Sequence, residues 1–166
     1  MKHCVECGTE LIKKELEKEG LIPFCPKCEQ FRFPIFNTAV SMIVVDRKNK
    51  KILLIQQYGR PFYILVAGYV NRGEAVETAV VREVKEETGL DVNEIRFNRS
   101  RFFEPSNTLM INFTCYIDDA NALSVNEEID SYAWFDFAEA KKEIKDGSLA
   151  EEFLVKYLDD MENVAG

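Results

Sequence analysis

The chain has 166 residues, of which 46% are hydrophobic, enough for one packed domain and a small appendage. Acidic residues (29) outnumber basic ones (21), and the net charge is −8. That balance argues against broad, sequence-independent binding of nucleic acid, which needs a basic surface.

Two further absences in the sequence narrow the functional classes. No apolar run reaches the length of a membrane span, and the first residues lack the apolar core of a signal peptide, so we expect a cytoplasmic protein with no membrane partner. The one histidine is His3, which argues against a serine–histidine or cysteine–histidine catalytic pair in the main domain. If the protein is an enzyme, carboxylates carry its chemistry.

Four cysteines in two CxxC pairs stand near the start of the chain: Cys4 with Cys7, and Cys25 with Cys28. Two such pairs at this separation are typical of two tight turns that supply four thiolates to a tetrahedral Zn²⁺. Four thiolates leave no position for water, so we expect a structural zinc ribbon over residues 1–34. The alternatives are two disulfides, disfavoured by the expected reducing compartment, or one redox CxxC, which would need a single pair.

Residues 35–166 are expected to form the main domain. Hydrophobic periodicity and turn residues predict strands at 38–46, 51–57, 63–67, 95–103, 109–117 and 131–135. They predict helices at 74–88, 137–145 and 149–161, the first closed by Gly89 in a left-handed conformation. This order of elements indicates an α/β domain with a mixed sheet between helices.

The helix predicted at 74–88 has an unusual face. An apolar stripe at helical spacing begins it and three carboxylates continue the same stripe: Val76, Ala79 and Val80, then Glu83, Glu86 and Glu87. Like charges one turn apart repel, and partly buried carboxylates are costly, so a hard divalent cation bound by them would remove the penalty. The alternative is a solvated charged face, but these carboxylates continue the apolar stripe instead of opposing it.

The segment around that helix matches a known signature at every specified position: Gly68, Glu74 and the run Arg82-Glu83-Val84-Lys85-Glu86-Glu87-Thr88-Gly89-Leu90. It resembles the Nudix box of the Nudix hydrolases. The resemblance implies an α/β/α sandwich whose loop–helix–loop binds Mg²⁺ or Mn²⁺ on a diphosphate. Hydrolysis of that bond needs charge neutralisation and an aimed water, both of which bound cations supply.

The resemblance also assigns roles to individual residues. Glu83 and Glu87 are implied as principal ligands of the catalytic cation, with Glu86 contributing. The carbonyl of Ala67 and the late glutamate Glu128 are implied as further ligands. An ion pair between Glu74 and Arg82 is implied to hold the loop to the helix.

A zinc ribbon directly before a Nudix domain resembles the NADH pyrophosphatase family. That family has a segment of the form SQPWPFPxS followed by Leu-Met, and the matching stretch here is residues 100–110, with Phe103 at the tryptophan position and Glu104 in place of a proline. The resemblance implies substrate contacts from Phe33, Phe102, Phe103, Ser106 and Ala150. For the three phenylalanines, the alternative is ordinary core packing.

The function that we expect is metal-dependent cleavage of an NAD(H)-type dinucleotide into two mononucleotides. One alternative is a Nudix hydrolase for another nucleoside diphosphate, such as ADP-ribose or a nucleotide sugar. Another is a non-catalytic zinc-ribbon regulator that binds nucleotides, but there we would expect a degenerate box and a basic ribbon. NAD-capped RNA is a further candidate substrate because the same bond is cut, and the resemblance suggests a homodimer.

Overall fold

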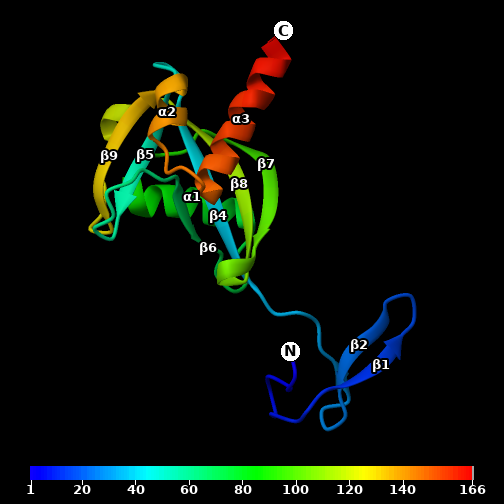
Figure 1. Ribbon diagram of the computed structural model, residues 1–166. Helices are drawn as coiled ribbons and strands as arrows, with labels where there is room; N and C mark the ends of the chain where they lie inside the picture. The colour runs from blue at the N-terminus through cyan, green and yellow to red at the C-terminus, as the bar shows by residue number, and fades with distance from the viewer. Residues whose placement is uncertain (166) are drawn as a thin grey trace. The chain divides into compact units, whose positions relative to one another are not determined.

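The computed structural model describes residues 1–165 and forms two compact units, Met1–Phe36 and a second that begins at Asn37 (Figure 1). The sequence had placed this boundary two residues earlier, between 34 and 35. None of the helices within residues 1–165 is both long and apolar enough to cross a membrane.

The first unit is a small antiparallel sheet of order β1-β2-β3, formed by β1 (Ile12–Leu16), β2 (Gly20–Cys25) and β3 (Gln30–Phe31). The rings of Phe24 and Phe31 make an edge contact, and Lys14 Nζ lies 4.2 Å from the Phe24 ring centroid. Across residues 1–36, the fully buried side chains are those of Cys4 and Cys25. The cysteine cluster therefore takes the place of a hydrophobic core.

The second unit is a mixed sheet with helices on both faces. Its elements are β4 (Asn37–Asp46), β5 (Lys51–Gln57), β6 (Val66–Tyr69), α1 (Val76–Thr88), β7 (Glu94–Phe103), η1 (Glu104–Ser106), β8 (Thr108–Ile117), η2 (Ala120–Ala122), β9 (Ile129–Asp136), α2 (Phe137–Glu143) and α3 (Leu149–Ala165). The strand order is β7-β8-β4-β5-β9; β4 and β8 are parallel, and β6 pairs with the first half of β4. The fold class predicted from the sequence is confirmed.

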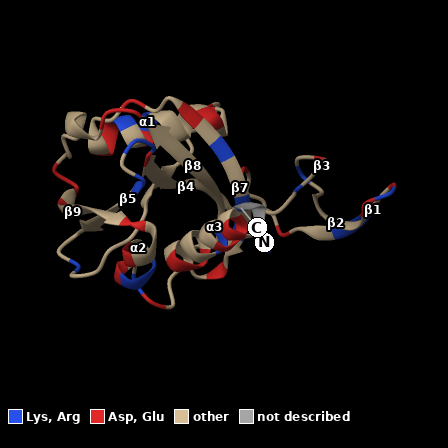
Figure 2. Cartoon of the chain, turned by 90° about the horizontal axis from the view of Figure 1, so that it is seen from above, with Lys and Arg blue, Asp and Glu red and all other residues tan. Residues whose placement is uncertain are grey.

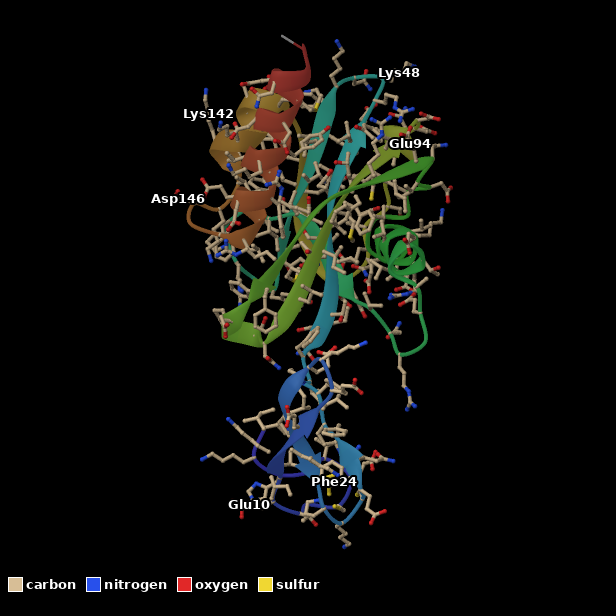
Figure 3. The ribbon with its side chains drawn as sticks, turned by 90° about the vertical axis from the view of Figure 1, so that its right-hand side faces the viewer. Glu10, Phe24, Lys48, Glu94, Lys142 and Asp146 are labelled. Atoms are coloured by element: carbon tan, nitrogen blue, oxygen red, sulfur yellow. The ribbon has the colours of Figure 1, made fainter. Side chains whose placement is uncertain are left out.

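Alternation along the central strands supplies two cores, one for each face of the sheet. On β4, Val40, Met42 and Val44 enter one core, whereas Ile43 and Val45 enter the other. The first core packs against α1 and the second against α2 and α3, so the sheet is covered on both sides (Figure 3). A continuous apolar run, with successive side chains on opposite faces, is expected of a strand that is buried on both sides.

Several predicted element boundaries need correction: the helix predicted at 149–161 runs to Ala165, the strand predicted at 131–135 spans Ile129–Asp136, and three further differences have a local cause. The strand predicted at 63–67 is regular only from Val66, because Tyr63 and Ile64 make isolated bridges. Helix α1 begins at Val76, since the Glu74 carboxylate accepts a hydrogen bond from the backbone N–H of Asn71 and so belongs to the loop. Helix α2 ends before residue 144 because the next residues leave it to pair with Tyr63.

Candidate functional site

A cavity of about 480 Å³ opens where α1 meets the sheet, and its size is within the range of ligand sites. Residues from β4, β6, α1, η1 and β8, and from the loops before β6, after β6 and before β9, line it. They are Ala39, Tyr58, Ala67, Gly68, Tyr69, Asn71, Arg82, Glu83, Glu86, Glu87, Ser106, Thr108, Met110 and Glu128. We call it the acidic cavity, because four carboxylates and one guanidinium are its charged groups among the described residues.

Glu87 is the innermost carboxylate of the acidic cavity, with 4% of its surface exposed. Burial raises the pKa of Glu87 to about 8, and the negative charges of Glu83 and Glu128 add to the shift. Its hydrogen-bond donor is Gln57, whose Nε2 lies 3.2 Å from Oε2. A buried carboxylate beside two like charges is costly unless a cation compensates it. The donor set, all hard oxygens, fits Mg²⁺ or Mn²⁺.

Glu83 lies directly over the backbone of Gly68. A Cβ added to Gly68 would stand 2.0 Å from Cδ of Glu83 and 2.3 Å from both carboxylate oxygens. The backbone φ of Gly68 is not positive, so glycine is needed here for close approach and not for its conformational freedom. The first glycine of the motif therefore makes room for a carboxylate against the strand.

Arg82 holds the loop to the helix. Its Nε and Nη2 donate to the two carboxylate oxygens of Glu74 at 2.7 and 2.9 Å, and Nη2 also donates to the carbonyl of Tyr69 at 3.0 Å. Its Nη1 donates to Glu83 at 2.7 Å and to Glu86 at 3.0 Å. The hydrogen bonds from Arg82 and from Asn71 lower the pKa of Glu74 to about 2. This bidentate pair is the geometry for which arginine is suited.

The buried face of α1 differs from the stripe predicted for it. Val84 and Thr88 are fully buried together with Glu87, whereas the Glu86 side chain is 57% exposed. Glu83, with 13% of its side chain exposed, stands at the edge of this face. The expectation of three carboxylates on the buried stripe is wrong for Glu86, because the helix turns that position toward the cavity mouth.

The four paired cysteines converge in the first unit, and their sulfurs all lie within 4.8 Å of one another. Among the described residues, no other three His, Cys, Asp or Glu bring ligand atoms this close. All five cysteines of the chain are free. Burial alone would raise the pKa of Cys4, but hydrogen bonds from the backbone of Glu6 and Cys7 and from Arg32 lower it to about 6. A cluster of this kind can bind zinc.

The residues predicted to contact substrate do not all reach one cavity. Ser106 lines the acidic cavity, whereas Ala150 lines a second cavity. Phe102 and Phe103, at the end of β7, are 39% and 37% exposed, and Phe33 in the first unit is 54% exposed. Core packing therefore does not account for these three rings.

Some residues of the acidic cavity were missed by sequence reasoning. Tyr58 adopts a left-handed φ of 57°, is 69% exposed, and donates a hydrogen bond to Glu128 at 3.4 Å. Gln57 ends the buried strand β5 and donates to Glu87. The available signal was a polar residue at the end of an apolar strand, followed by Tyr-Gly. The partners of Gln57 and Tyr58 are thirty and seventy residues away in the chain, so the sequence alone does not pair them.

Comparison with known proteins places this geometry in a family. The NUDIX domain family matches residues 36–156. The NAD-capped RNA hydrolase NudC of Vibrio atlanticus (strain LGP32) is 28% identical over 97% of this chain and 59% of its own length. The protein of the same name from Pseudomonas aeruginosa (strain LESB58) is 29% identical over 81% of this chain and 47% of its own. The chain thus spans about half the length of these curated relatives.

The fold has close counterparts among solved structures. A NUDIX hydrolase from Nitrosomonas europaea superposes with a TM-score of 0.68 at 22% identity, covering 98% of this chain and 93% of that one. The likeness shows the fold alone, whereas the family match covers the motif residues that line the acidic cavity. This chain belongs to the NUDIX domain family.

Proposed function

We propose that this protein hydrolyses the diphosphate bond of an NAD(H)-type dinucleotide, releasing two mononucleotides, with Mg²⁺ or Mn²⁺ as cofactor. The observation that carries the proposal is the buried carboxylate of Glu87, uncompensated beside Glu83 and Glu128 in a cavity of ligand size. The names of the curated relatives and the cysteine cluster before the domain support the NAD-type substrate.

The cation would be held by Glu83, Glu87 and Glu128 with the Ala67 carbonyl, and Glu86 would contribute from the cavity mouth. When bound, it neutralises the charge of the diphosphate and lowers the pKa of a water at the site. The cation is needed for electrostatic reasons. Without it, a chain of net charge −8 with four carboxylates in its cavity would repel a diphosphate.

The remaining residues orient this set. Arg82 fixes the loop through Glu74 and restrains Glu83 and Glu86 through one nitrogen, Nη1. Tyr58 restrains Glu128, whose backbone N–H is also bonded to Asn126 Oδ1 at 3.0 Å. Glu83 and Glu86 are thereby held from α1 itself, whereas Gln57 and Tyr58, at the end of β5 and just after it, hold Glu87 and Glu128, which orients the donors before substrate arrives.

The finer assignments belong to the same proposal. Residues 1–34 would be a zinc ribbon with one structural Zn²⁺ on Cys4, Cys7, Cys25 and Cys28, and residues 35–166 the catalytic domain. Phe33, Phe102 and Phe103 offer exposed rings on which a nucleobase could stack, and Ser106 and Ala150 line adjoining cavities. NAD-capped RNA contains the same diphosphate bond and is a second candidate substrate. We expect the reaction to take place in the cytoplasm.

A substrate panel tests the proposal. Purified protein is assayed with NADH, NAD⁺, ADP-ribose and dinucleoside polyphosphates, with Mg²⁺, with Mn²⁺ and with neither cation. We expect cation-dependent release of mononucleotides, fastest from NADH or NAD⁺. Equal rates on ADP-ribose would replace the dinucleotide assignment with the broader one, and no turnover of any diphosphate would refute the proposed activity.

A further inference from the structure

A second cavity, of about 210 Å³, adjoins the acidic cavity, and Ala67 and Met110 line both. Its other walls come from β4, the segment between β5 and β6, the turn between α2 and α3, and the start of α3: Ser41, Arg60, Phe62, Ile64, Leu65, Lys145, Ser148, Leu149, Ala150 and Phe153. At less than half the volume of the acidic cavity, it suits one part of a ligand that extends from there.

The charge of this second cavity is the opposite of its neighbour's. Arg60 and Lys145 line it, and no Asp or Glu is among its described lining residues. Over the rest of the domain the two signs are interspersed, as Figure 2 shows. The acid that follows in sequence, Asp146, lies on the outer edge of the turn before α3 and does not line the cavity (Figure 3).

Neither cation is neutralised by the protein. Within residues 1–165, Arg60 and Lys145 take part in no ion pair, although the chain has more acids than bases. The Lys145 ammonium lies 4.1 Å from the ring centroid of Phe62, which orients it over an apolar surface.

The backbone around Lys145 is well fixed. Its N–H donates to the carbonyl of Tyr63 at 2.9 Å, and its carbonyl accepts from the hydroxyl of Ser148 at 2.6 Å. The same Ser148 hydroxyl accepts from the N–H of Glu151, so the turn leads directly into α3, whose first turn lines the cavity. The first turn of that helix carries Glu151, which accepts from the Gly147 N–H, and Glu152, which pairs with Arg101, so the positive charge of the cavity comes from Arg60 and Lys145.

We propose that this second cavity is an anion subsite that binds a third phosphate of the substrate, carried on a ribose beyond the diphosphate that is cleaved. Buried Leu65 and Phe153 form part of its wall, and an apolar wall strengthens the attraction between a phosphate and the two cations. The inference rests on the proposed function, because the diphosphate must occupy the acidic cavity for a third phosphate to reach Arg60 and Lys145.

Two substrates present this phosphate in different forms. NADPH carries it as a monoester on the adenosine ribose, and an NAD-capped dinucleotide RNA carries it as a phosphodiester. The experiment compares kcat/KM for both with that for NADH, in the wild type, Arg60→Gln, Lys145→Gln and the double variant. Lys142→Gln makes the same change in net charge on α2, outside the second cavity, and is the matched control.

We expect the double variant to lose about tenfold in kcat/KM for at least one phosphate-bearing substrate and less than about twofold for NADH, the scale of a lost charge-assisted hydrogen bond. Arg60→Lys should recover most of the loss at position 60. A loss confined to NADPH identifies the monoester as the ligand, and one confined to the capped RNA identifies the phosphodiester. Equal effects on all substrates, or an equal effect of Lys142→Gln, would overturn the inference.

A binding measurement separates this inference from the proposed activity. In buffer with Mg²⁺, calorimetry compares the non-hydrolysable α,β-methylene analogues of ADP-ribose and 2′-phospho-ADP-ribose, so that the cation is present and no bond is cleaved. The wild type should bind the phosphorylated ligand about tenfold more tightly, and the double variant should bind the two alike. Equal wild-type affinities would overturn the subsite even if the enzyme hydrolyses NADH, whereas a preference without hydrolysis would overturn only the proposed function.

Discussion

The two candidate metal centres of this chain differ in how their ligands are held. In the first unit, four sulfurs lie within 4.8 Å of one another, and the fully buried side chains of that unit are cysteines. In the second unit, two hydrophobic cores cover both faces of a sheet, and Arg82 restrains Glu83 and Glu86 at the side of the acidic cavity. A metal in the first site would stabilise the fold, whereas a cation in the second would serve chemistry in a domain that already has its core.

The largest effect should follow from breaking the cysteine cluster. Cys4→Ser removes a buried ligand, and with it most of the free energy that structural zinc contributes, which is on the order of 10 kcal/mol in small zinc domains. We expect loss of bound zinc and of amide protection in residues 1–36, with the second unit still folded. Metal analysis and hydrogen exchange check this, and full protection without zinc would contradict it.

The next largest effect should distinguish the buried from the exposed carboxylates. Glu83→Gln keeps the shape of a side chain that is 13% exposed and removes its charge, so we expect turnover to fall about 100-fold or more. Glu86→Gln, at a side chain that is 57% exposed, should cost less. Steady-state rates with saturating Mg²⁺ give the comparison. A larger loss for Glu86→Gln than for Glu83→Gln would show that the burial of a carboxylate does not determine its contribution to turnover.

A smaller effect should come from the contact between strand and helix. Gly68→Ala places a Cβ 2.0 Å from Cδ of Glu83, so the carboxylate must move, and a displacement near 1 Å costs roughly 100-fold at most. In a Glu83→Ala background the same substitution should cost almost nothing further. A double-mutant cycle measures the coupling between the two positions, and additive losses would show that Gly68 acts in another way.

The smallest effect should concern substrate selection. Phe103→Ala removes an exposed ring at the end of β7, and we expect a loss of about 1–3 kcal/mol in dinucleotide binding, the scale of one base stacked on an aromatic side chain. ADP-ribose, which lacks a second base, should be affected less. Phe97→Ala on the same strand is the control, since Phe97 lies in the first half of β7, whereas Phe103 directly precedes η1, whose Ser106 lines the acidic cavity. Equal losses on both substrates would remove Phe103 from the specificity site.

The sequence was most informative where one short segment contains all the necessary contacts. The Gly68–Leu90 motif has Gly68, Arg82 and its last three glutamates close together in the chain, so their meeting in one cavity could be anticipated. The CxxC pairs are equally local, because each makes its own turn. The exposure of Glu86 could not be anticipated, since it depends on the exact rotation of α1 against the sheet.

Contacts between segments that are distant in the chain could not be predicted from the sequence. Gln57 bonds with Glu87 and Tyr58 with Glu128 across thirty and seventy positions, and neither glutamine nor tyrosine has a spacing that marks it. The second cavity is harder still, because Arg60 and Lys145 come together only after β5, β6 and α3 have packed. Short motifs therefore predicted the ligands and the Glu74–Arg82 pair, but not Gln57 and Tyr58, which hold Glu87 and Glu128.

The central claim is that the acidic cavity holds a catalytic cation through Glu87. The most direct test is the rate of NADH hydrolysis as a function of Mg²⁺ concentration for the wild type and Glu87→Gln, both with zinc bound. We predict that the wild-type rate rises with Mg²⁺ to a plateau, and that the variant remains near background at every concentration. A variant that matches the wild-type curve would contradict the account.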